Sequence, residues 1–289
     1  MKNPTSTKHP WFREKSYIHF DTPIGSKRAE KYVKHFQKNP VHDFYPFLTY
    51  TLTTRKVVRI PISDRKNPKH SLKFKPKKRP LAYAAHRDRA IYSYYSYLLS
   101  SCYETYLGSC SFSESIIAFR KLGKNNIHFA KEVFEEIKIH SNCVVIAMDI
   151  ESFFDNLDHK ILKYQWKEVL GKPTLPDDHY QVFKAITKYS TIDQKNVFKK
   201  LNISRNNIPK DLYKLCDSTV FRSQIRPLIN VSTNAKLRTK GIPQGSPISA
   251  VLSNIYMLNF DKGAHELAKS VGGKYSQFKI KLLWLVQIP

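Results

Sequence analysis

The clearest candidates for catalytic residues lie in one stretch, residues 143–159, which reads CVVIAMDIESFFDNLDH. It opens with a short apolar run without turn residues, and this pattern predicts a buried central strand. Asp149 ends the run, and a carboxylate there is unfavourable unless a partner such as a metal ion neutralises it. A single aspartate can also cap a strand at the protein surface, so Asp149 alone leaves both interpretations open.

A second stretch that could bind a ligand, residues 240–260, reads KGIPQGSPISAVLSNIYMLNF. Its glycines and prolines predict an irregular loop from which Gln244 projects. Ser246 is predicted to cap the next helix, with Pro247 in its first turn. Backbone N–H groups of the loop and of that helix end could contact a phosphate or a template. The helix is expected to bury one apolar stripe, made of Ile248, Val251, Leu252, Ile255 and Leu258.

Positive charge gathers in a third stretch, residues 51–89. From Arg55 to Arg89 there are thirteen lysines and arginines against two aspartates. Two strands flanking a lysine-rich turn over residues 65–78 would form a basic hairpin. Such a hairpin could close over triphosphates or a nucleic-acid backbone, because lysine and arginine side chains bind phosphate oxygens. A solvated basic loop is the alternative interpretation.

The whole chain has the same excess of positive charge. Its 289 residues carry a net charge of +26 with a pI near 9.8, and 41% of them are hydrophobic. This composition is typical of a globular protein with a polyanionic partner, most simply a nucleic acid; a merely basic protein is the alternative. The sequence shows neither a signal peptide nor an apolar run long enough for a membrane span. Its four cysteines lack C-x-x-C spacing, so no zinc site is predicted and a reducing cytoplasm is expected.

Helices and one sheet are expected to position these stretches. Helices are predicted over residues 84–108, after a cap at Asn125 or Asn126, over residues 159–170 before Gly171, and near residues 178–189 and 210–216. With the strand before Asp149, this order predicts an α+β fold with helices on one side of a sheet. Residues 1–50 are expected to form a loosely structured extension with short helices. The first two helices are expected to bury Ile91, Tyr94, Tyr95, Leu98 and Cys102, and Ile127, Ala130, Phe134 and Ile137.

Two of these stretches carry a family resemblance. DIESFFDNLDH, followed about 90 residues later by GIPQGSPISAVLSNIY, resembles two motifs of bacterial reverse transcriptases of the group II intron, retron and phage-defence kinds. The upstream KKRPLAYAAHRDRAIYSYYSYLL and SIIAFRKLGKNNIHFAKEVFEEI look like the fingers and upper palm of that family. The resemblance covers roughly residues 50–275, and HFDTPI near the N-terminus is most similar to antiviral members, which implies antiphage defence.

The resemblance implies a right-hand polymerase with an antiparallel palm sheet backed by helices. Residues 1–50 would be an extension, 51–140 fingers and upper palm, 141–275 an incomplete palm, and 276–289 a divergent tail. The implied activity is RNA-directed DNA polymerase: nucleotidyl transfer from dNTPs to a primer 3′-hydroxyl with two Mg²⁺ ions. The implied partners are an RNA template and a DNA, RNA or protein primer, in the cytoplasm.

The resemblance also assigns roles by position. Asp149 corresponds to the first metal-binding aspartate, with the Ile150 carbonyl as a further ligand, and Phe154 to a steric gate that excludes a ribose 2′-hydroxyl. Gln244 would contact the incoming nucleotide, while Asp155 and His159 would orient the loop and helix cap. Arg79 would grip the triphosphate with help from Lys77, Lys73 or Lys75. The residues expected to bind nucleic acid are Lys75, Lys78, Arg87, Arg89, Gly245 and Ser246.

One departure from the family concerns its third motif, an aromatic and a small residue before paired aspartates. After Tyr275 the chain reads SQFKIKLLWLVQIP, with no acid beyond Glu266 and no thumb. With Asp149 alone, two cations would be held poorly because their mutual repulsion is largely uncompensated. The loss of resemblance after Tyr275 suggests a frameshift or a premature stop. Two hypotheses follow: a reverse transcriptase by descent and fold that is active only if the missing carboxylates are restored or supplied by another chain, or a truncated, non-catalytic product that at most binds nucleic acid. An RNA polymerase or primase is a more distant alternative, against which the bulky Phe154 argues.

Overall fold

The computed structural model describes residues 9–61, 70–139, 143–204, 206–229, 238–278 and 281–287. This part of the chain mixes helices and strands, as predicted, and contains no helix long and apolar enough to cross a membrane. The α-helices are α1 (Ser26–Lys38), α2 (His86–Gly108), α3 (Asn126–Ile139), α4 (Phe153–Asn156), α5 (His159–Leu170), α6 (Asp177–Thr187), α7 (Gln194–Lys200), α8 (Ser218–Val220) and α9 (Ser249–Ser270). The strands are β1 (Phe47–Pro61), β2 (His70–Tyr83), β3 (Cys143–Asp149), β4 (Thr191–Asp193), β5 (Lys274–Phe278) and β6 (Lys281–Gln287).

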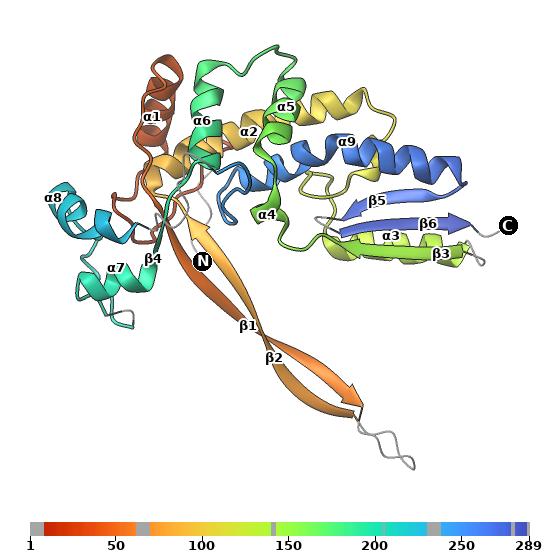
Figure 1. Ribbon diagram of the computed structural model, residues 1–289, viewed down its shortest axis with the longest axis horizontal. Coiled ribbons are helices and arrows are strands. Elements are labelled where there is room, and N and C mark those ends of the chain that lie inside the picture. Colours follow the sequence, from red (N-terminus) through yellow and green to blue (C-terminus); the bar gives the residue numbers. More distant parts are fainter. Residues whose placement is uncertain are drawn as a thin grey trace.

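The predicted basic hairpin is present. Strands β1 and β2 pair antiparallel from Leu48 opposite Tyr83 outward, and the ribbon projects from the body of the molecule (Figure 1). The prediction of a lysine-rich turn over residues 65–78 was wrong in its extent, because residues 70–78 belong to β2. Successive side chains of a strand point to opposite faces, so alternating lysines can extend into solvent without breaking the strand. At the root of the hairpin, β1 also pairs parallel with β4.

The second sheet has the order β3–β6–β5, and its neighbouring strands are antiparallel. Alternate side chains of β5 contact different helices. Tyr275 donates a hydrogen bond to Asp261 of α9, whereas Lys274 forms an ion pair with Glu136 of α3. Adjacent residues of a strand face opposite sides. Helices α9 and α3 therefore lie against opposite faces of β5, whereas the sequence predicted helices on one side only.

The prediction that β3 is a buried central strand was wrong. Within the described residues β3 pairs only with β6, and six of its seven residues, Asp149 among them, are exposed. An edge strand has a neighbour on one side only, and here the side chains of β3 are also left largely uncovered. Helix α3 shows a similar difference: Asn125 Oδ1 accepts the Ile127 N–H, as expected of the cap, but Ile127 and Phe134 of the predicted buried face are exposed.

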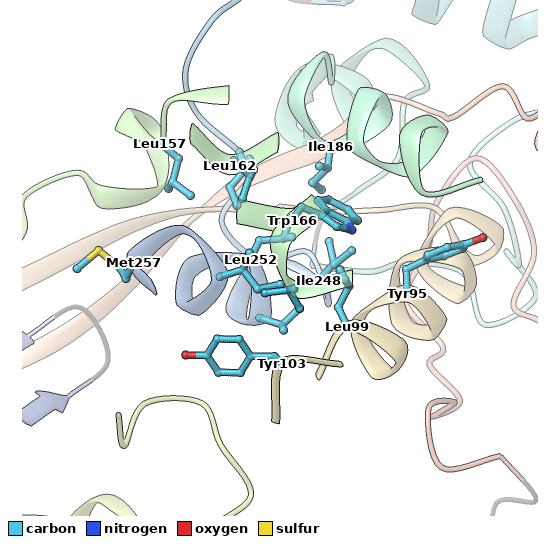
Figure 2. Close-up of a cluster of buried hydrophobic side chains, with 14 of the residues drawn as sticks. Tyr95, Leu99, Tyr103, Leu157, Leu162, Trp166, Ile186, Ile248, Leu252 and Met257 are labelled. Carbon is cyan, nitrogen blue, oxygen red and sulfur yellow. The ribbon is translucent and has the colours of Figure 1, made fainter. Parts of the chain in front are cut away.

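The main core gathers where α2, α5 and α9 meet, as Figure 2 shows for Leu99, Trp166 and Leu252. The apolar stripe predicted for α9 is buried throughout, and Gly108 ends α2 as expected. On α2, however, Ala90 and Tyr92 are also fully buried, because α2 packs against α1 and α6 as well as against α5 and α9. The other buried apolar side chains of α2 recur every four residues. These side chains are Ile91, Tyr95, Leu99, Tyr103 and Leu107. The predicted Tyr94, Leu98 and Cys102 are half-buried, whereas residues 210–216 form turns instead of a helix.

The segment before β1 is more ordered than the sequence suggested. It contains α1 and buries Phe12 and Phe20. The buried Asp21 carboxylate accepts hydrogen bonds from the backbone N–H groups of His86 and Arg87, at 2.8 and 2.9 Å. A negative charge at a helix N-terminus is favourable because it interacts with the helix dipole. The carboxylate at the N-terminus of α2 therefore comes from Asp21 of the same chain.

Asp261 fixes α9 to β5 through the hydrogen bond that it accepts from Tyr275. Burial raises the pKa of Asp261 to about 7, and the hydrogen bond from Tyr275 opposes that shift. Between the ordinary aspartate pKa near 4 and about 7, the folded protein keeps a proton that the unfolded chain has lost. Stability should therefore fall as pH rises through this window, by up to about 1.4 kcal/mol per pH unit from this group.

The asparagine in the Asp261→Asn variant cannot ionise. The difference in free energy of unfolding between this variant and the wild type should therefore shift in favour of the variant from about pH 4 to pH 7. Urea unfolding at a series of pH values measures the difference. Asp211→Asn, at an exposed aspartate, is the control and should track the wild type. Parallel curves for wild type and Asp261→Asn would contradict the expectation.

Candidate nucleic-acid interface

The stretch around Asp149 and the stretch that begins at Lys240 lie side by side. The loop before α9 runs antiparallel to the segment between α4 and α5. The Ile242 N–H donates to the Phe154 carbonyl at 2.8 Å, and the Gly241 N–H donates to the Leu157 carbonyl at 2.8 Å. A β-bridge between Asp158 and Lys240 extends the pairing. Segments about 90 residues apart in the sequence are thus held together by their backbones.

The same loop contacts the root of the basic hairpin. The Ala82 N–H on β2 donates to the Gln244 carbonyl at 2.8 Å. Gly245 follows with φ at +117°, and a Cβ atom there would lie 2.5 Å from the Ala82 carbonyl oxygen. Only glycine combines this conformation with such a close approach. The loop therefore joins the hairpin to the stretch that follows Asp149.

Two side chains at the start of α5 hold this arrangement. Asp158 caps the helix by accepting N–H groups of Lys160 and Ile161. His159 Nε2 lies 2.8 Å from the Gly241 carbonyl, and burial lowers the pKa of His159. A neutral imidazole with its proton on Nε2 donates to that carbonyl. The expected orienting role of His159 matches this contact, and the aspartate that caps the helix is Asp158.

Two of the residues predicted to contact a nucleotide, Phe154 and Gln244, lie where the loop before α9 meets the segment after Asp149 and the root of the hairpin. Phe154 is half-buried, with its ring edge-on to Phe153 at 5.6 Å between centroids. Gln244 is exposed, as its place in the turn predicts. Ser246 is buried, and α9 begins only at Ser249, so the prediction that Ser246 caps the helix was wrong. The Ser249 hydroxyl instead donates to the Pro243 carbonyl at 2.7 Å, which fixes the loop to the helix.

The register of the hairpin determines which of its lysine and arginine side chains share a face. Directly opposed residues of an antiparallel pair share a face. Lys75 lies opposite Lys56, and Arg79 opposite Leu52, so both belong to one face; Lys78 lies opposite Thr53 on the other. We call the first set the cationic face: Lys56, Lys73, Lys75, Lys77 and Arg79. All of these side chains are exposed. Sequence reasoning missed Lys56, which only the register aligns with the others.

Arg87 and Arg89 lie at the start of α2 and have partners within the chain. The Arg87 guanidinium lies over the Tyr32 ring, 5.6 Å from its centroid. Arg89 Nη1 donates to the Arg13 carbonyl at 2.7 Å. Both arginines therefore hold the N-terminal segment against α2. Nucleic-acid binding by either side chain stays a prediction.

The described residues do not fit a pair of Mg²⁺ ions. In this part of the chain no three His, Cys, Asp or Glu residues gather closely enough to hold a metal ion. Asp149 is exposed at the end of β3, and the register of the sheet places Lys281 opposite it. Mg²⁺ prefers several hard oxygen ligands, which a lone aspartate cannot supply.

No family model matches this chain, and neither does any curated protein. Similar solved structures include apo telomerase from Candida tropicalis truncated from its C-terminal domain, with 9% identity, coverage of 92% of this chain and 50% of that one, and a TM-score of 0.43. Another is a partial Cas6-RT-Cas1–Cas2 complex, with 14% identity, coverage of 93% and 34%, and a TM-score of 0.40. This chain thus spans half of the first of these chains and about a third of the second.

Proposed function

We propose that this chain is a reverse transcriptase domain that binds an RNA template and a primer and acts on dNTPs. The observation that supports it is the junction of three separate stretches: the loop through Gln244, the segment from Phe154 to His159, and the hairpin root at Ala82. The two motifs that resemble reverse transcriptases are therefore neighbours in space. A cationic hairpin rises from the same place, and the chain carries a net charge of +26.

In this proposal the cationic face binds phosphates through Lys75, Lys77 and Arg79, because exposed lysine and arginine side chains release counterions on contact with a polyanion. Gln244 contacts the incoming nucleotide, and the Phe154 ring excludes the ribose 2′-hydroxyl. Asp149, with the Ile150 carbonyl, is the proposed remnant of a metal site. A role in antiphage defence is proposed from the HFDTPI resemblance alone.

A second function, nucleic-acid binding without catalysis, is favoured by one observation. The described residues provide no three-residue metal cluster, so they supply no carboxylates that could hold a metal ion together with Asp149. Binding of RNA through the hairpin would not need that site.

Primer extension by the 289-residue chain, with an RNA template, dNTPs and Mg²⁺, separates the two functions. Polymerase activity predicts extension that Asp149→Ala abolishes while RNA binding persists; Asp211→Ala, at an exposed aspartate elsewhere, should retain extension. Phe154→Val should then admit ribonucleotides. RNA binding without extension would favour the second function, and extension by Asp149→Ala would contradict the role of Asp149.

A further inference from the structure

A tyrosine-rich hollow of about 1090 Å³ lies at the foot of the hairpin, and its lining does not include the residues that form the junction described above. The N-terminal segment contributes Tyr17, the hairpin Tyr50 and Tyr83, α7 Phe198, and the segment after it Tyr213. Helix α7 packs beside the foot of β1 in Figure 1. Four separate parts of the chain thus build one aromatic-lined hollow that the proposed function does not use.

The aromatic rings are held in a defined arrangement. The Tyr83 ring packs edge to face against Tyr17, with 5.1 Å between ring centroids, and edge to face against Tyr50, with 5.9 Å between ring centroids. Tyr17 is held in two ways: its hydroxyl donates to the Ala84 carbonyl at 2.8 Å, and one face of its ring stacks on His86, with 4.4 Å between ring centroids. The rings of Tyr50 and of the exposed Tyr213 can stack on a flat aromatic ligand.

Polar and charged groups accompany the rings. Gln194 lines the hollow and donates from Nε2 to the Tyr83 hydroxyl at 2.8 Å, which holds its amide in place. Lys210 lines it as well, and Lys195, Lys199 and Lys200 are exposed on α7. Amides form hydrogen bonds with the edges of bases, and lysines bind phosphates. The combination matches a nucleobase attached to a phosphate backbone.

We propose that this hollow binds an unpaired base of a single-stranded nucleic acid, with the backbone against Lys210 and the lysines of α7. It rests on the proposed function in one respect, which is that a nucleic acid is the ligand. Aromatic side chains that stack on bases are worth about five- to one-hundred-fold in affinity per base. A duplex presents no unpaired base, so the hollow should contribute nothing to duplex binding.

Fluorescence anisotropy with a labelled, unstructured 12-nucleotide RNA tests this proposal. Tyr213→Ala and Tyr50→Leu should each weaken binding about five- to ten-fold, whereas Tyr213→Phe and Tyr50→Phe should stay within about two-fold, because stacking needs the ring and not the hydroxyl. Tyr97→Ala, at an exposed tyrosine of α2 outside the hollow, is the matched control. The same substitutions should weaken the binding of a single-stranded DNA 12-mer as much as that of the RNA, because DNA bases present equivalent flat faces.

A 12-base-pair RNA duplex supplies the second comparison and should bind all variants equally. Equal single-strand affinity for wild type, Tyr213→Ala and Tyr50→Leu would overturn the proposal, and so would an equal loss of duplex affinity. Photocrosslinking from a 5-iodouridine in the 12-mer should label Tyr50, Tyr83 or Tyr213; labelling confined to residues outside the hollow would also overturn it. Binding that depends on these tyrosines, without primer extension, would support base binding in the hollow and would contradict the proposed polymerase activity.

Discussion

Gly245→Ala should lower the free energy of unfolding by roughly 2–4 kcal/mol. At φ of +117° an alanine is strained, and its Cβ would meet the Ala82 carbonyl oxygen at 2.5 Å. That oxygen belongs to the backbone of β2, so it cannot move without disturbing the hairpin root. Because the loop also pairs with Phe154 and Leu157, the strain should spread to the junction. Chemical denaturation measures the loss.

Gly263→Ala is the matched control for this change. Gly263 lies within α9, and a Cβ there would meet nothing within 4 Å. Alanine is a better helix former than glycine, so this variant should be about 0.5–1 kcal/mol more stable than the wild type. Unchanged stability of Gly245→Ala would mean that the loop does not approach β2 as closely as described.

Replacing Lys73, Lys75, Lys77 and Arg79 together with glutamine should weaken single-stranded RNA binding on the order of 100-fold at low salt. The four side chains share the cationic face, so one strand of phosphates can contact them together. Each lost phosphate contact lowers the log–log salt slope by about 0.7 on single strands, so the slope should become shallower by about three. Filter binding over a range of KCl concentrations measures both quantities.

The control removes equal charge from another surface: Lys27, Arg28, Lys31 and Lys38, exposed on α1, become glutamine. Net charge then falls by the same amount, but the cationic face is intact. Only a small, general loss of affinity is expected. If both quadruple variants bind RNA alike, the hairpin has no special role, and binding depends on net charge alone.

Local sequence was enough to predict several elements. Helix α5 from His159 to its end at Gly171, the buried stripe of α9 and the presence of a basic hairpin all depend on periodicity and on residues that start or end an element. These signals act over a few residues, so they need no knowledge of distant segments. The same holds for Gln244, whose exposure depends on the turn that Pro243 and Gly245 form.

Burial and partners could not be predicted in this way. An apolar run does not show how many strands will pair with it, and β3 is an exposed edge strand that carries Asp149 outside any metal cluster among the described residues. The anion at the start of α2 comes from Asp21, 65 residues upstream, and no local pattern links the two.

The amino-acid sequence was therefore sufficient for most of the element types, although not for residues 210–216, and for the excess of positive charge and the two motifs. Tertiary structure alone decided that Phe154, Gln244 and Ala82 meet, that Lys56 joins the cationic face, and that four tyrosines share one hollow. The physical reason is that propensity and periodicity act between near neighbours in the chain. Register, edge position and close backbone approach depend instead on segments that folding brings together from far apart.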